Sequence, residues 1–337
     1  MKLTRRTFVK LAGLAGIVGL TGTLAGCENK SAGNSNTTAN VAGANKIPHD
    51  AKATVYFSKT IDAEHLIALY NKINGDITGK VAIKLHTGEP NAPNILPPDM
   101  VKIFQAQVPN SAIVETNVAY GGMRSTTEGH RRVLKDNGWT FCPVDIMDED
   151  GDVDFPISNG FHLKKVAMGA HINNYDSMIV LTHFKGHAMG GFGGSLKNIA
   201  IGCASGKKGK RQVHGLEDYG EWIRGDKFME MLADSGKAIC EHFGKQIVYL
   251  NVLQRLSVDC DCAGAGAAAP EMPDLGILAS TDILAVDQAS VDMIYKFPGD
   301  EKNSLIERIE SRHGLRQLSA MAEHEMGTSD YELVSID

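Results

Sequence analysis

The chain alternates apolar runs of strand character with amphipathic, helix-like segments over most of its length. This alternation limits the possible folds strongly, because strands joined by helices pack as a mostly parallel sheet covered by helices. The sequence therefore predicts an α/β fold. The expected strands are residues 54–57, 80–85, 112–115, 178–181, 247–252 and 275–279. The expected helices are residues 62–73, 99–107, 125–137, 226–243 and 285–295.

Polar or glycine-rich segments follow five of the expected strands, and several carry ionisable side chains. Parallel strands end at one edge of their sheet, and α/β proteins bind ligands at that edge. We therefore expect these segments to line one shared site at the carboxyl edge of the sheet. The segments are residues 86–90, 117–127, 182–202, 257–262 and 280–282.

The overall charge argues against a nucleic-acid partner. The chain of 337 residues has 34 Lys and Arg against 40 Asp and Glu, a formal net charge of −6. Binding to a phosphate backbone needs a dominant basic face, which this balance does not favour. Local basic clusters remain compatible with a small anionic ligand.

The first residues are typical of an export signal. The pair Arg5 and Arg6 resembles a twin-arginine signal read by that export machinery, and a glycine-rich apolar run follows at residues 11–26. That run is shorter than the roughly 20 residues that span a bilayer. The run ends before Cys27 in a sequence that resembles a lipoprotein cleavage box. We therefore expect a signal peptide at 1–26, a lipid on Cys27, a flexible tether at 27–46 and a folded domain at 47–337, held on the outer face of the cytoplasmic membrane.

Residues 182–202 combine cations with very little side-chain bulk. His183, Lys185, His187 and Lys197 lie in this stretch, and histidine is the usual acid or base and a common metal ligand. These four residues are the candidate catalytic group. The alternative is that the two histidines only cap backbone groups.

Glycines in the same stretch favour close contact with a ligand. Gly193 and Gly194 precede a helix expected from about Ser195, where backbone amides are able to meet a phosphate or carboxylate. Lys185 and Lys197 would neutralise that anion.

Two thiols and two carboxylates stand together in residues 259–262. Asp259, Cys260 and Cys262 predict a transition-metal site of nickel, iron or zinc, because thiolate ligands suit those metals better than magnesium. A cubane iron–sulfur cluster would need four cysteines. The alternative is a reduced surface loop without a metal.

Several of these motifs resemble the family called Domain of Unknown Function 362. The resemblance covers essentially the whole domain after the tether, and its most specific part is the run H-F-K-G-H-x-x-G-G-F-G-G-x-L-K-N from His183. Many members are labelled iron–sulfur centre proteins, a label associated with a C-x-x-C-x-x-C segment that this chain does not contain. The family implies no settled activity. Its motifs include Arg124 and Gly191, which with Gly193, Gly194 and Lys197 are the candidate cofactor-binding residues.

A shorter run, from His187 to His214, is similar to the nickel-pincer lactate racemases. That resemblance implies that Lys197 holds a cofactor covalently, that His214 binds nickel and that His187 moves protons. His86 and His183 are candidates for a second proton-transfer residue.

Three classes of function stay open. The first is a metal- or cofactor-dependent enzyme acting on a small anionic substrate, with racemase-like or isomerase-like proton transfer. The second is an iron–sulfur or other metal-binding electron-transfer protein. The third is a lipid-anchored binding protein without catalysis. The sequence identifies neither substrate, metal nor oligomeric state.

Overall fold

The computed structural model describes residues 52–337, and the predicted signal peptide, Cys27, the whole predicted tether and residues 47–51 of the predicted domain lie outside these residues. Within them, an eight-stranded sheet forms the centre of the fold. Its strands, in spatial order, are β12 (Tyr331–Ser335), β1 (Ala53–Ser58), β11 (Gly276–Ser280), β10 (Ile247–Leu253), β7 (Ser177–His183), β2 (Val81–Lys84), β3 (Ser111–Glu115) and β4 (Val144–Ile146).

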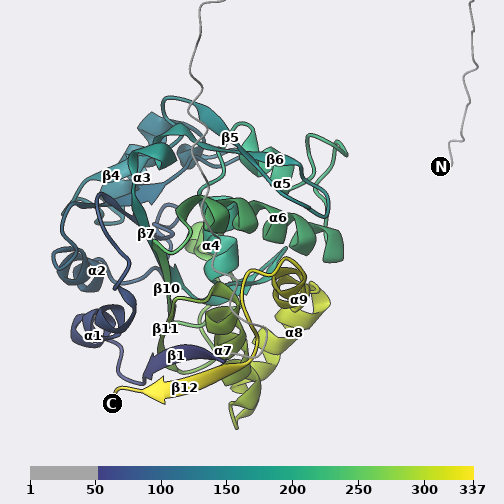
Figure 1. Cartoon of the computed structure of the whole chain (residues 1–337). Helices are drawn as coiled ribbons and strands as arrows, with labels where there is room; N and C mark the ends of the chain where they lie inside the picture. Colours follow the sequence, from purple (N-terminus) through teal and green to yellow (C-terminus); the bar gives the residue numbers. More distant parts are fainter. Residues whose placement is uncertain (1–51) are drawn as a thin grey trace, which may run out of the picture. The chain divides into compact units, whose positions relative to one another are not determined.

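Helices cover both faces of this sheet (Figure 1). One face packs against α1 (Ala63–Ile73), α2 (Pro98–Gln105) and α3 (Thr127–Asp136). The other packs against α4 (Ser195–Gly202), α6 (Asp226–Phe243) and α7 (Ile283–Lys296), with α5 (Gly209–Val213), α8 (Asn303–Ser311) and α9 (Arg316–Glu323) beside them. The predicted α/β class, with a mostly parallel sheet flanked by helices, is confirmed.

The central strands are buried on both faces, which explains their nearly continuous apolar sequences. In β7, Ile179 and Leu181 face the cluster under α1 and α2, whereas Met178 and Val180 face the cluster under α4 and α7. The period of two along a strand produces this division. Two short hairpins, β5 (Asp152–Pro156) with β6 (Lys165–Gly169) and β8 (Lys185–His187) with β9 (Gly191–Gly193), extend from this framework.

One expectation about the sheet edge is wrong. Strand β11 runs antiparallel to both β1 and β10, so its carboxyl end lies at the opposite edge from those of β2, β3, β7 and β10. The segment 280–282 therefore does not join the shared site. Asp282 instead lines a separate cavity of about 410 Å³ beside the amino end of β10. The sequence pattern of a buried strand is the same in either direction, so periodicity did not reveal the reversal.

A buried carboxylate fixes the start of α4, the helix that carries Lys197. Asp287 of α7 accepts hydrogen bonds from the backbone amides of Ser195 at 2.7 Å and Leu196 at 3.0 Å. It also accepts one from the Asn251 side chain of β10 at 2.8 Å. These bonds satisfy amides that a helix start leaves without partners, and they join α4, α7 and the sheet.

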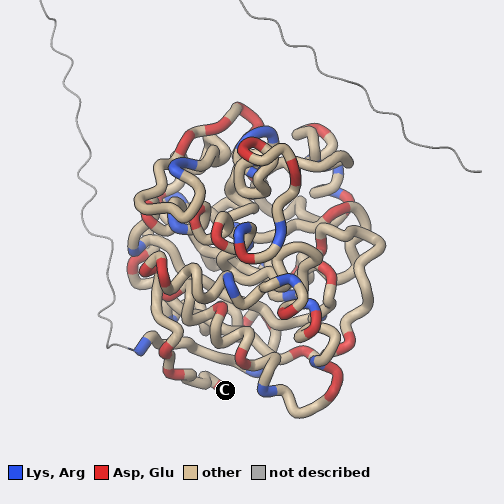
Figure 2. The backbone as a smooth tube through the Cα atoms, turned by 90° about the vertical axis from the view of Figure 1, so that its right-hand side faces the viewer, with Lys and Arg blue, Asp and Glu red and all other residues tan. Residues whose placement is uncertain are grey.

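Acidic and basic residues are interspersed along the backbone on the side of the molecule shown in Figure 2. Within residues 52–337, no helix combines the length and the apolar composition needed to cross a lipid bilayer.

Replacing Asp287 by Ala should destabilise the protein by about 2–4 kcal/mol, because buried amides lose their acceptor.

Burial raises the pKa of Asp287 to about 6, above its ordinary value of 3.8. The folded chain thus holds this proton more tightly than the unfolded chain. The contribution of this proton to the stability of the folded protein is fully present below about pH 3.8 and is lost as the pH rises through about 6. Urea unfolding from pH 4 to 7 measures this slope. Asp287→Asn should flatten it, and an unchanged slope would show that Asp287 does not titrate there.

Candidate functional site

A cavity of about 110 Å³ lies at the carboxyl edge of the main sheet. Its walls come from the segments that follow β2, β3, β7 and β10, together with α4 and the end of α5. Four of the five expected strand ends therefore meet in one place. Ionisable side chains dominate the lining: Lys84, His86, Glu115, Arg124, His183, Lys185, His187, Lys197, Lys210, His214, Cys260 and Cys262.

Glu115, at the end of β3, forms ion pairs with two of the cations. Its carboxylate lies 3.1 Å from Lys84 and 2.9 Å from Arg124. Burial opposes ionisation of Glu115, but Lys84 and Arg124 outweigh it and hold the pKa of that carboxyl well below its usual range. Arg124 also contacts Glu89 at 3.3 Å. The guanidinium lines the cavity but is already bound to protein carboxylates.

Asp261 neutralises a third cation. Its Oδ2 atom lies 3.1 Å from the ammonium group of Lys185 and 2.8 Å from Nδ1 of His183. The other ring nitrogen of His183 lies 2.7 Å from the carbonyl oxygen of Gln254. Both nitrogens of His183 therefore face oxygen atoms of the protein, and the ring positions Asp261 beside Lys185.

Lys197 and Lys210 have no carboxylate partner within residues 52–337. The half-buried Lys197 makes no hydrogen bond or ion pair with any described residue, and its side chain lines the cavity. Lys210 is buried and contacts only neutral oxygens, the hydroxyl and carbonyl of Thr116 and the carbonyl of Asn117. Burial lowers the pKa of Lys210 to about 8, so it is still mostly charged at neutral pH. The cavity therefore carries cationic charge that the protein does not compensate.

His187 ends β8, in the turn that leads to β9. Its Nδ1 atom accepts hydrogen bonds from the backbone amides of Met189 at 3.1 Å and Gly190 at 2.9 Å. A nitrogen that accepts two N–H groups carries no proton, so the proton of the neutral ring lies on Nε2. Burial, together with the charge of Lys197, lowers the pKa of His187 well below its usual range and keeps the ring neutral. His187 is thus a hydrogen-bond donor through Nε2.

His214 has the opposite arrangement. Its Nδ1 atom lies 2.7 Å from the carbonyl oxygen of Lys210, so Nδ1 carries the proton and donates it. Its Nε2 atom has a free lone pair and no hydrogen-bond partner among the described residues. Burial lowers the pKa of His214 to about 4, with Lys197 and Lys210 adding to the effect. His214 therefore offers a lone pair where His187 offers a proton.

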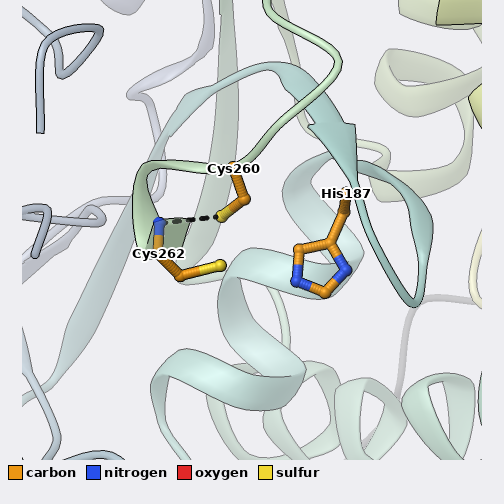
Figure 3. Close-up of side chains that lie close together, drawn as sticks. All are labelled: His187, Cys260 and Cys262. Atoms are coloured by element: carbon orange, nitrogen blue, oxygen red, sulfur yellow. Dashed lines mark hydrogen bonds between the residues drawn. The ribbon is translucent and has the colours of Figure 1, made fainter. Parts of the chain in front are cut away.

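His187, Cys260 and Cys262 place candidate metal-binding atoms within 4.8 Å of one another. Figure 3 shows the ring nitrogen Nε2 of His187 turned toward the two sulfur atoms. Two thiols suit a soft transition metal. The imidazole does not complete such a site in this tautomer, because a proton occupies the lone-pair position that a metal would use. The donor set therefore fits a soft metal through the two sulfurs and not through the ring.

Two residues predicted from the sequence, Asp259 and Gly191, do not line the cavity. Asp259 contacts Arg308 at 3.0 Å and the backbone amide of Ala268 at 3.1 Å, and it does not line the cavity. Gly191 packs against Gly314, where an added Cβ would lie only 2.7 Å from the Gly314 Cα atom. Its φ of 75° also favours glycine. Gly191 therefore serves close packing of the hairpin against the segment between α8 and α9.

The start of α4 lies at the cavity, as expected from the sequence, but its first amides are not free. Gly193 and Gly194 line the cavity. A Cβ at Gly194 would lie 2.5 Å from the Asp287 carboxylate, whereas one at Gly193 would meet only ordinary contacts beyond 3.7 Å. Asp287 already binds the first two amides of α4, those of Ser195 and Leu196, so these two are not available to an anion in the cavity.

Several site residues were not identified from the sequence. Lys84 and Glu115 are charged residues at the ends of otherwise apolar central strands, and that placement was a usable signal. Asp261 is one of the two carboxylates of the motif at 259–262, but the sequence did not show which of the two would face the cavity cations. Lys210 had no such signal, because it lies in neither a motif nor a periodic segment. A second group of candidate ligands, Asp145, Glu149 and His171, lies near the surface beside β4.

Long-range proton–nitrogen NMR should find the proton of His187 on Nε2 and that of His214 on Nδ1. Variants with Gln at each position assign the signals. His214 should stay neutral until about pH 4. Because the unfolded ring binds its proton near pH 6.5, the unfolded chain holds more protons between these values, and stability should rise with pH over that interval. A His214 signal that titrates near pH 6.5 would contradict the buried, lone-pair assignment.

Two solved structures are similar to part of this chain. One similar solved structure is the lactate racemase apoprotein from Thermoanaerobacterium thermosaccharolyticum, with 12% identity, a TM-score of 0.40, and coverage of 72% of this chain and 57% of that chain. Another is a structural-genomics protein from Thermotoga maritima, with 8% identity, a TM-score of 0.40, and coverage of 79% and 60% respectively. The chain thus spans less than two thirds of either protein. No curated protein matches it.

The family predicted from the motifs is confirmed. The model of the Domain of unknown function (DUF362) matches residues 81–292, which is more than half of the chain and includes α4, the two histidines and the cysteine pair. The chain belongs to the DUF362 family.

Proposed function

We propose that this protein is an enzyme that moves a proton on a small anionic substrate, at the outer face of the cytoplasmic membrane. One observation carries the proposal. A single cavity contains two lysines without a carboxylate partner among the described residues and a histidine whose free lone pair faces no protein donor.

The charge of the cavity supports an anionic substrate. Glu115 and Glu89 together balance Lys84 and Arg124, and Asp261 balances Lys185. The ammonium group of Lys197 is left for a ligand, with Lys210 behind it. In a partly buried site a carboxylate or phosphate at contact distance from an ammonium group interacts with it more strongly than in water.

Two complementary histidines support proton transfer. His214 presents a lone pair and acts as the base, and His187 presents an N–H group that stabilises negative charge as it develops on the substrate. A neutral imidazole is suited to this second role, because its N–H is held in place by the amides of Met189 and Gly190. A carbon beside a carboxylate is the substrate position that such a pair would deprotonate, as in racemisation or isomerisation.

Lys197 has one of two roles in this proposal. It is either the main counter-charge of the substrate or the covalent attachment point of a cofactor, as the similarity to the nickel-pincer enzymes implies. Its unpartnered amino group is compatible with both. Mass spectrometry of protein from its own host separates them, since a tethered cofactor adds mass to the peptide that contains Lys197.

Lys197→Met should weaken binding of inorganic phosphate and of short 2-hydroxycarboxylates by at least about tenfold, corresponding to about 1.4 kcal/mol. Lys207→Met is the matched control, because Lys207 is exposed and outside the cavity lining. Isothermal titration calorimetry measures the affinity of both variants.

Exchange of the substrate's α-hydrogen with deuterated solvent should disappear in His214→Gln. Binding without any exchange in the wild type would leave a non-catalytic binding protein.

The electron-transfer alternative receives less support from the geometry. Among the described cysteines, Cys142, Cys203 and Cys240 lie outside the group formed by Cys260 and Cys262. A cubane cluster held by residues 52–337 of one chain would lack two of its four ligands. Nickel, iron and zinc remain predictions from the sequence.

The proposed location rests on the predicted export signal and the predicted lipid on Cys27. Replacing Arg5 and Arg6 together by Lys should retain the precursor in the cytoplasm, because the export machinery reads that pair. Replacing Cys27 by Ser should release the mature protein from the membrane fraction in soluble form. Cell fractionation with immunoblotting measures both outcomes. A Cys27→Ser protein that still sediments with membranes would contradict the lipid anchor.

A further inference from the structure

The cavity at the carboxyl edge of the sheet has an apolar part as well as a cationic part. Its apolar lining consists of Val118, Ala119, Tyr120, Ile201 and Trp222. The first three follow β3, Ile201 belongs to α4, and Trp222 lies in the segment between α5 and α6. The proposed proton transfer uses none of these side chains. Apolar and aromatic lining beside a few polar groups is typical of sites that bind an organic molecule.

Two of these residues, Tyr120 and Trp222, are aromatic and remain exposed, with 41% and 37% of their surfaces accessible to solvent. Seven large apolar residues are exposed within residues 52–337, and two of them line this one cavity. Apolar surface in contact with water does not stabilise the fold, whereas covering it with a ligand is favourable by about 25 cal/mol per Å². The two rings are therefore available to a ligand.

Both rings are held beside the cavity before any ligand binds. The hydroxyl group of Tyr120 donates a hydrogen bond to Glu89 at 2.8 Å. The residue after Trp222, Ile223, donates its backbone N–H to the carbonyl oxygen of His214 at 3.0 Å. The Trp222 ring centroid lies 4.5 Å from that of the His214 ring. A side chain that is already fixed loses little conformational entropy on binding, so this lining is preorganised for an apolar group.

The apolar lining lies next to the cation that has no carboxylate partner among the described residues. Ile201 follows Lys197 by four residues on α4, so the two side chains lie on the same face of that helix, and both line the cavity. Trp222 contacts His214, the proposed base. A carboxylate bound at Lys197 thus leaves the apolar residues to the rest of the ligand molecule.

We propose that the substrate is a carboxylate with an aromatic substituent, and that Trp222 and Tyr120 determine this specificity by packing against the substituent. An aromatic group suits the lining because indole and phenol rings pack favourably against another ring. An inorganic anion or a short aliphatic acid would satisfy Lys197 and leave both rings uncovered. This inference rests on the proposed anionic substrate and names its chemical class.

Isothermal titration calorimetry of the mature protein with lactate and with 3-phenyllactate tests the proposal. The two acids share the carboxylate and the hydroxyl group and differ by one phenyl ring. Racemic ligands are used, so that interconversion of the enantiomers does not change what is titrated. Phenyllactate should bind at least about tenfold more tightly and with a more negative heat-capacity change, because its ring leaves water. Equal affinities for the two acids would overturn the proposal.

Trp222→Ser separates the apolar contact from the anion site. The ratio of the lactate Kd to the phenyllactate Kd should fall at least about fivefold in this variant. Tyr219→Ser is the matched control, because Tyr219 is an exposed aromatic residue of the same segment that does not line the cavity. The ratio should be unchanged in this control. Circular dichroism confirms that both variants are folded. A ratio that Trp222→Ser does not lower, or that Tyr219→Ser lowers equally, would contradict the assignment.

Tyr120 provides an independent check. Tyr120→Ser should lower the same ratio, whereas Tyr120→Phe should retain most of it, because phenylalanine keeps the ring and lacks only the hydroxyl group. Equal ratios in these two variants would show that the ring does not contact the substituent. Lactate binding that depends on Lys197 without a preference for phenyllactate would overturn this inference and leave the anionic substrate standing. Lactate binding that Lys197→Met does not weaken would count against the proposed function as well.

Discussion

The cap that Asp287 places on α4 determines where the chemistry of this protein lies. The carboxylate joins the start of α4 to α7 and, through Asn251, to the central sheet. Lys197 projects from the first turn of that helix into the cavity. Because the cap is an internal anion, the helix start is satisfied without a ligand, and recognition of an external anion passes to lysine side chains. The sequence suggests that backbone amides at the start of α4 bind an anion, whereas in the fold the lysine side chains of the cavity are left for that role.

The lysines and carboxylates of the cavity divide into two sets. Glu115 and Asp261 are buried with Lys84, Arg124 and Lys185, and each charge there stabilises its partner in surroundings that would otherwise penalise both. Lys197 and Lys210 stand outside these pairs. The paired set maintains the shape of the cavity, and the unpaired set leaves an excess of positive charge. An anionic ligand would complete the balance, which is the physical basis of the proposed substrate class.

His187 and His214 differ in which ring nitrogen carries the proton, because their Nδ1 atoms meet different backbone groups. In His187 it meets two amide N–H groups, and in His214 it meets a carbonyl oxygen. The first ring therefore presents a proton to the cavity and the second a lone pair. In this tautomer the ring of His187 does not offer a lone pair to a metal beside Cys260 and Cys262, although the three residues have the spacing of a metal site.

The sequence by itself determined the fold class, the family, most of the strands and four of the five strand ends at the site, because hydrophobic periodicity and glycine-rich motifs are local properties of the chain. It also identified His187, Lys197, Cys260 and Cys262 as residues of one region. Only the tertiary structure decided the reversal of β11, the capture of the α4 amides by Asp287, and the pairing of Asp261 with Lys185. Each of these depends on a partner distant along the chain. Protonation of a ring and pairing of a charge are set by such neighbours, and no spacing within the sequence specifies them.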